Sequence, residues 1–137
     1  MMKIYKSRED GVLETLDHIE PGVWVELVNP SAQEIDTVAT ELNIDPNLIM
    51  AALDEEERPR VEIEREGYGL IVADFPYLRM DDSRIYDTMP LGIVYCESAI
   101  VTVCLREVPV LKFFSEGRVK GFLTQFKSRF ILQILYK

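Results

Sequence analysis

Residues 24–35 read WVELVNPSAQEI, and this stretch decides how the middle of the chain is built. The run from Val23 to Val28 is mostly apolar and favours a β-strand, which the dipeptide Asn29-Pro30 stops. Ser31 and Glu34 then form a capping box: the serine oxygen accepts from the third backbone N–H of a helix, and the glutamate reaches back to the first cap residue. The sequence therefore predicts a strand that leads directly into a helix.

Two helices are expected after this strand. The first carries a single apolar stripe at helical spacing, made by Ile35, Val38, Ala39 and Leu42. Asp45-Pro46 begins the second, because aspartate is a good N-cap and proline fits the first helical position. Arg58-Pro59 stops it, since the residue before a proline is driven out of helical geometry.

The segment from residue 60 to 66 is predicted to be a strand. Val61 and Ile63 alternate with Glu62 and Glu64, a period of two that separates an apolar face from an acidic one. Residues 70–75, 91–96 and 99–105 are predicted as further strands, the last two as a hairpin. We expect an α/β fold, a mixed β-sheet flanked by helices. The residues expected in its core are Val61, Ile63, Ile71, Val94 and Val103, with Glu62 and Glu64 facing solvent.

The last residues of the chain return to a helical pattern. From Phe122 onward, Phe126, Phe130 and Ile134 recur every four residues, and no helix stop precedes Lys137. We therefore expect an α/β domain over residues 1–120 and, over 121–137, the start of a long helix. Residues 89–105 are the longest apolar candidate for a membrane span, and Glu97 and Ser98 interrupt it.

Charge is distributed unevenly along the 137 residues. Residues 1–105 carry 8 basic and 22 acidic side chains, a net charge of −14, whereas residues 106–137 carry 7 basic and 2 acidic ones. Nucleic-acid binding rests on basic surfaces, so an acidic body disfavours such a partner. Cations, or a basic surface of another chain, are better candidates.

Catalytic and redox motifs find little support in the sequence. The sequence has too few metal-binding side chains for a zinc site, with two cysteines, Cys96 and Cys104, and one histidine, His18. The cysteines are interpreted as reduced thiols in the core, and the histidine as a surface residue. Phosphate-binding glycine loops and hydrolase motifs are absent, so no enzyme is predicted. The amino terminus has no signal-peptide pattern, which favours an intracellular location.

Three short motifs, in this order, resemble the CorA family of magnesium and cobalt transporters. They are the strand with tryptophan ending in Asn29-Pro30-Ser31, the helix start Leu42-Asn43-Ile44-Asp45-Pro46, and the segment Glu57-Arg58-Pro59-Arg60-Val61-Glu62. Residues 126–136 resemble the start of the family's helical region that leads to the pore. The resemblance implies the cytoplasmic amino-terminal domain of a divalent-cation transporter, attached to the membrane only through carboxy-terminal helices that lie outside this sequence.

The resemblance also implies partners and a regulatory ion. Members of the family are expected to be homopentamers whose cytoplasmic domains sense Mg²⁺ through acids at subunit contacts; Mg²⁺ or Co²⁺ is the transported and regulatory ion, and no cofactor is tightly bound. In this sequence the positions that often carry those acids are apolar, Met50 and Ala51. The candidate ligands are therefore the acids one helical turn later, Asp54, Glu55 and Glu56. A solvated helix end is the alternative interpretation of these acids. For the whole chain, the alternative is a stand-alone α/β ligand-binding or regulatory module.

Overall fold

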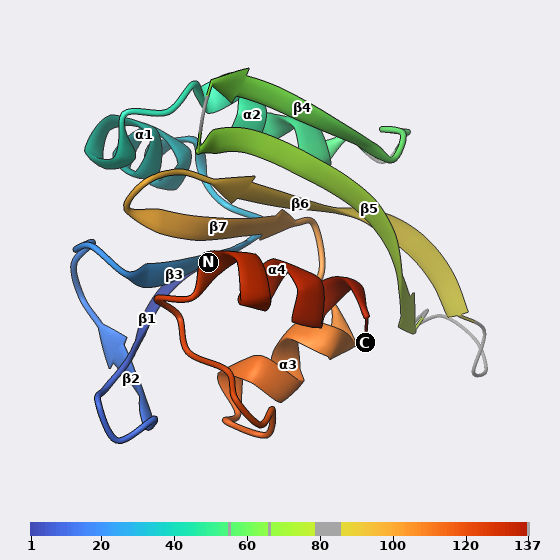
Figure 1. Ribbon diagram of the computed structural model, residues 1–137. Helices are drawn as coiled ribbons and strands as arrows, with labels where there is room; N and C mark the ends of the chain where they lie inside the picture. Colours follow the sequence, from blue (N-terminus) through green and yellow to red (C-terminus); the bar gives the residue numbers. More distant parts are fainter. Residues whose placement is uncertain (55, 66, 79–85, 137) are drawn as a thin grey trace.

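The computed structural model describes residues 1–54, 56–65, 67–78 and 86–136, and these form a mixed sheet between two layers of helices (Figure 1). The strands are β1 (Met2–Ser7), β2 (Leu13–Leu16), β3 (Val23–Val28), β4 (Arg60–Arg65), β5 (Tyr68–Leu78), β6 (Tyr86–Tyr95) and β7 (Ala99–Cys104). The helices are α1 (Ala32–Leu42), α2 (Pro46–Met50), the 3₁₀ helix η1 (Ala51–Leu53), α3 (Pro109–Ser115) and α4 (Lys127–Leu135). The predicted α/β architecture is confirmed.

The seven strands lie in the order β2-β1-β3-β7-β6-β5-β4. The central pair β3 and β7 is parallel, and all the other neighbours are antiparallel. A parallel pair needs a long crossover, which α1, α2 and the strands β4 to β6 provide between β3 and β7.

Helix starts follow the local signals. Ser31 Oγ accepts from the backbone N–H of Glu34 at 3.1 Å, and Glu34 Oε1 accepts from the N–H of Ser31 at 2.9 Å, so the predicted capping box is present. Asp45 Oδ1 accepts from the N–H of Asn47 at 2.9 Å and caps α2. These contacts satisfy helix-start donors that would otherwise have no partner.

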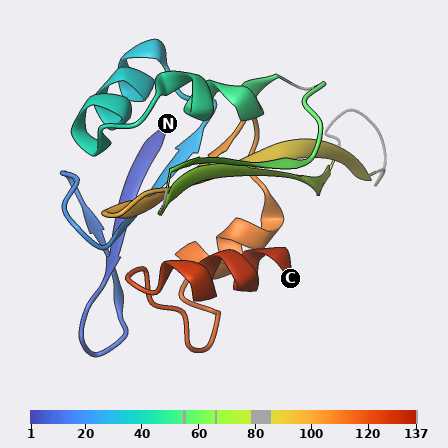
Figure 2. The ribbon, with the colours of Figure 1, turned by 45° about the horizontal axis from the view of Figure 1, so that its top comes forward.

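Two cores lie on opposite faces of the sheet. Helices α1, α2 and η1 cover one face, and α3 and α4 cover the other (Figure 2). The second core is aromatic and centres on Trp24, whose ring meets those of Tyr5, Phe122 and Phe130 at centroid distances of 4.7, 6.0 and 5.1 Å. The indole Nε1–H of Trp24 donates to Thr102 Oγ1 at 2.8 Å, which satisfies a polar group that is fully buried.

The prediction that Val61 and Ile63 are buried is wrong. Their exposed fractions are 64% and 74%, although Val94 and Val103 are buried as predicted and Ile71 is half-buried. Both residues lie on β4, the last strand of the sheet, on the face that α3 and α4 cover elsewhere. The alternating pattern correctly places them on one face, but no helix among the described residues buries these two side chains.

Helix α4 begins at Lys127, later than the pattern from Phe122 predicts. Ser7 and Thr124 bind each other twice, each backbone N–H donating to the other side-chain hydroxyl at 3.0 Å. These bonds tie the residues before α4 to β1 and keep them out of the helix. Phe126 is consequently exposed, whereas Phe122, Phe130 and Ile134 are buried as the stripe predicts.

Candidate functional site

The acids proposed as cation ligands lie where η1 ends. Asp54 is exposed, and its Oδ1 accepts from the backbone N–H of Glu56 at 3.0 Å while its carbonyl accepts from the N–H of Glu57 at 3.0 Å. Asp54 thus closes a tight turn. Glu56 is exposed beside it, and Glu55 lies outside the described residues. Asp54 and Glu56 are therefore neighbours on the surface.

The next acid along the chain is already paired. Arg60 donates to Glu57 through Nη1 and to Glu62 Oε2 through Nε, the latter at 2.8 Å. Both bonds, together with the two carboxylate charges, raise the pKa of the Arg60 guanidinium. Glu57 is therefore less available to a cation than Asp54 or Glu56, whose carboxylates have no cationic partner among the ion pairs of the described residues.

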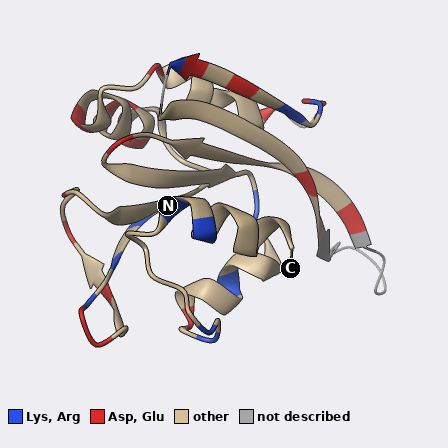
Figure 3. Cartoon of the chain, viewed as in Figure 1, with Lys and Arg blue, Asp and Glu red and all other residues tan. Residues whose placement is uncertain are grey.

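Charged residues are distributed unevenly over the elements (Figure 3). Strand β4 carries two glutamates between two arginines, whereas α3 and α4 carry basic residues and no acidic ones. Across the described ranges, no group of three or more His, Cys, Asp and Glu side chains is placed to hold a metal ion. A cation at Asp54 and Glu56 would accordingly need water or a second chain for its remaining ligands.

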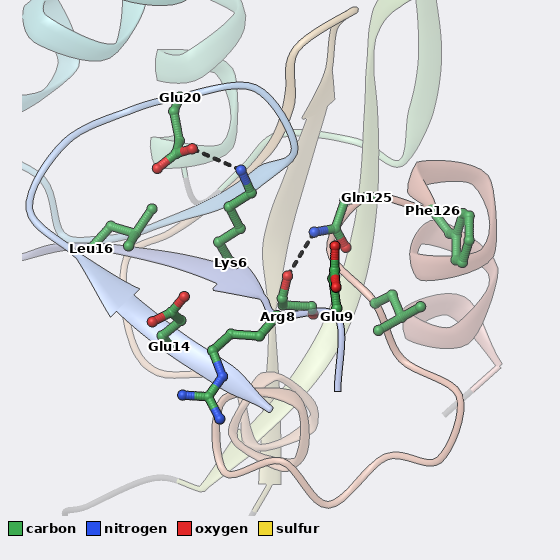
Figure 4. A pocket seen from close by; sticks show the side chains of 10 residues that line it. Lys6, Arg8, Glu9, Glu14, Leu16, Glu20, Gln125 and Phe126 are labelled. Atoms are coloured by element: carbon green, nitrogen blue, oxygen red, sulfur yellow. Dashed lines mark hydrogen bonds and ion pairs between the residues drawn. The ribbon is translucent and has the colours of Figure 1, made fainter. Parts of the chain in front are cut away.

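A cavity of about 570 Å³ lies between the β1–β2 hairpin and the segment before α4 (Figure 4). Its lysine is paired, because Lys6 Nζ lies 2.7 Å from Glu20 Oε2. Glu20 also meets His18 Nε2 at 3.0 Å, and His18 Nδ1 meets Asp17 Oδ1 at 2.9 Å. The hydrogen bond with Asp17, and to a smaller extent that with Glu20, raises the pKa of His18. Lys6 and Glu20 in the wall of this cavity are thus engaged in a chain of ion pairs that continues through His18 to Asp17.

A second cavity, of about 380 Å³, holds a carboxylate that sequence reasoning missed. Glu26 on β3 is 9% exposed, and its Oε1 accepts from the Tyr5 hydroxyl at 3.2 Å. Loss of hydration on burial raises the pKa of Glu26, and Tyr5 partly opposes this shift. Lys3 is its partner in the β1–β3 register, and Glu107 and Lys112 line the same cavity. A lone acid within the apolar run of residues 23–28 was the available signal.

The two cysteines are buried as predicted. Burial raises the pKa of the Cys104 thiol to about 12, so it stays protonated at neutral pH and is a poor nucleophile. Both cysteines are thus free thiols of the core. No helix in the described part of the chain is long and apolar enough to cross a bilayer.

Comparison with known proteins gives a consistent family signal. The family model described as CorA-like Mg²⁺ transporter protein matches residues 20–136. The complete CorA magnesium transporter from Methanocaldococcus jannaschii is similar at a TM-score of 0.75 and 22% identity, with 99% of this chain and 43% of that chain covered. No curated protein matches the sequence.

Two structures of isolated domains are also similar. The soluble domain of the same CorA matches at a TM-score of 0.75 and 22% identity, covering 99% of this chain and 54% of that one. The ZntB cytoplasmic domain from Vibrio parahaemolyticus matches at a TM-score of 0.76 and 14% identity, covering 98% of this chain and 55% of that one. At these identities the structural likeness shows the fold. This chain spans about half the length of even these isolated domains.

Proposed function

Because this chain belongs to the CorA-like Mg²⁺ transporter family, we propose that it is part of the cytoplasmic regulatory domain of a divalent-cation transporter. The family match over residues 20–136 is the observation that carries this proposal. Its role is to report the concentration of Mg²⁺ or Co²⁺ to a pore formed elsewhere in the complete protein, and not to catalyse a reaction. Its partners are other subunits of the same transporter, arranged as a homopentamer on the cytoplasmic face of the membrane.

Asp54, Glu55 and Glu56 are the proposed sensing residues. Asp54 and Glu56 are exposed and adjacent, and the body that carries them is strongly acidic. Mg²⁺ keeps several of its waters and needs only one or two carboxylates, so an incomplete site on one subunit suffices once a second subunit contributes. A cation that bridges two subunits binds the closed assembly more tightly than separate domains, and only such a difference in affinity can shift the equilibrium.

The test is cation flux through the full-length protein in vesicles, measured against internal Mg²⁺. Replacing Asp54→Asn, Glu55→Gln and Glu56→Gln together is expected to raise the Mg²⁺ concentration for half-closure about tenfold, which corresponds to roughly 1.4 kcal/mol of lost binding free energy. The matched control is Asp36→Asn with Glu41→Gln, two exposed acids on α1, and it is expected to leave that concentration unchanged.

The possible outcomes separate the two parts of the proposal. An unchanged Mg²⁺ dependence in the triple variant contradicts sensing by these residues but leaves the transporter assignment in place. A full-length protein that conducts neither Mg²⁺ nor Co²⁺ contradicts the transporter assignment itself.

A further inference from the structure

The cavity that contains Glu26 lies between the sheet and helix α3. Glu26 of β3 and Tyr5 of β1 line it from the sheet, and Lys112 and Ser115 line it from α3. Its volume of about 380 Å³ falls within the range of roughly 300–1,000 Å³ that is usual for pockets that bind small molecules. We call this space the β3–α3 cavity.

Glu26 brings a buried carboxylate to this cavity. Glu26 is 9% exposed, and its Oε1 accepts from the Tyr5 hydroxyl at 3.2 Å, whereas no hydrogen bond or ion pair within the described residues engages Oε2. In the same residues, Gln133 Oε1 is the fully enclosed side-chain atom that lacks a partner, so Glu26 Oε2 is open to the cavity. A buried carboxylate is costly unless a cationic or hydrogen-bonding group meets it, so Oε2 offers a place for such a group.

Hydroxyl groups add further acceptors beside this oxygen. The Tyr5 hydroxyl gives its proton to Glu26 and keeps its lone pairs. Burial raises the pKa of Tyr5, and the Ser115 side chain, which partly opposes this shift, is therefore close to the same hydroxyl. Ser115 Oγ donates to the Lys112 carbonyl at 3.2 Å, so its oxygen can also accept. A protonated primary amine, with one positive charge and three N–H donors, matches one charged and two neutral acceptors.

The mouth of the cavity carries the opposite charge, on its exposed lining residues Lys3 and Lys112. Lys3 is paired with Glu26 in the β1–β3 register, so the two side chains project from the same face. Across the described part of the chain, Lys3 takes part in no ion pair. Lys112 Nζ lies 3.5 Å from Glu107 Oε2, and both side chains are 59% exposed, so this pair is weak. The mouth can therefore receive an anionic group.

We propose that the β3–α3 cavity binds a free amino acid as its zwitterion, with the ammonium group at Glu26 and the carboxylate towards Lys3 and Lys112. An inner positive end and an outer negative end complement the buried acid and the two lysines. A simple carboxylate would be repelled by Glu26, and a simple amine would leave both lysines without a partner. The cavity and η1 lie on opposite faces of the sheet, so this binding does not depend on cation sensing.

The test is thermal unfolding of the 137-residue chain with each standard amino acid in turn. At about ten times its dissociation constant, a bound amino acid is expected to raise the midpoint by roughly 4–7 °C. Glu26→Gln keeps the shape of the side chain and removes its charge, and it is expected to weaken binding at least about tenfold. Glu41→Gln, at an exposed position on α1, is the matched control and is expected to leave binding unchanged.

A second comparison tests the outer end of the ligand. The tightest-binding amino acid is compared with the corresponding amine that lacks its carboxylate, as ethanolamine corresponds to serine. Lys3→Gln is expected to weaken binding of the amino acid about tenfold and to leave binding of the amine unchanged. Lys3 is exposed, so this variant keeps the proposal testable if Glu26→Gln fails to fold.

Three results overturn the proposal. An unchanged midpoint with every amino acid shows that none binds in the cavity. Equal affinity in Glu26→Gln and the parent places the amino acid elsewhere on the chain. An amine that binds as tightly as its amino acid, with no effect of Lys3→Gln on either, shows that the cavity takes amines and not zwitterions.

Discussion

Removing the hydroxyl of Thr102 should destabilise the domain without leaving a cavity. Trp24 Nε1 donates to Thr102 Oγ1 at 2.8 Å across the parallel β3–β7 pair, and both side chains are completely buried. Valine has nearly the shape of threonine, so Thr102→Val removes only the acceptor and leaves the indole N–H without a partner. The expected cost is about 1–3 kcal/mol, the penalty for a buried unsatisfied donor.

Urea unfolding followed by circular dichroism measures this cost. The midpoint should fall while the dependence of the unfolding free energy on urea stays the same, because the surface exposed on unfolding is unchanged. Repeating Thr102→Val in a Trp24→Phe background closes a double-mutant cycle, and there the substitution should cost much less, since no indole donor remains. An equal cost in both backgrounds would refute the hydrogen bond as the cause.

Three further predictions concern single side chains. Ser31→Ala should lower the free energy of unfolding by about 1 kcal/mol in denaturant melts, because the Glu34 N–H loses its cap; an unchanged midpoint would contradict the cap. Folding raises the pKa of Glu26 above its ordinary value of 4.5, so the free energy of unfolding should fall as the pH rises from 4.5 through the pKa of the folded state. Glu26→Gln should remove this pH dependence and be more stable than the parent at pH 7. Parallel stability profiles of variant and parent against pH would contradict the raised pKa. Cys104 should resist alkylation at pH 8 until the domain unfolds, and rapid reaction in the native protein would show that the thiol is neither buried nor protonated.

The local parts of the fold could be predicted from the sequence. The capping box at Ser31 and the Asp45-Pro46 start each depend on residues within one helical turn, and both are present. Burial could be predicted less well, because it depends on which helices pack over a strand face. Val61 shows the limit: its alternation with Glu62 fixes the face on which it lies, but whether a helix covers that face depends on residues far away.

The candidate site was predictable to a similar degree. The exposure of Asp54 and Glu56 follows from an acidic run at a helix end, and the structure places both on the surface. The pairing of Glu57 with Arg60 needs the turn between η1 and β4, which only the folded chain shows. The burial of Glu26 depends on its pairing with Lys3 across β1 and β3 and on α3, whose residues line the same cavity. Its environment could therefore not be predicted from residues 23–28 alone.

The proposed role of this chain is to regulate a divalent-cation pore. The most direct measurement compares Mg²⁺ flux through the full-length protein with flux through a version that lacks residues 1–137, at low and high internal Mg²⁺. If residues 1–137 carry the regulation, the intact protein closes as internal Mg²⁺ rises, whereas the shortened one continues to conduct. Closure with the same Mg²⁺ dependence in both proteins would contradict it.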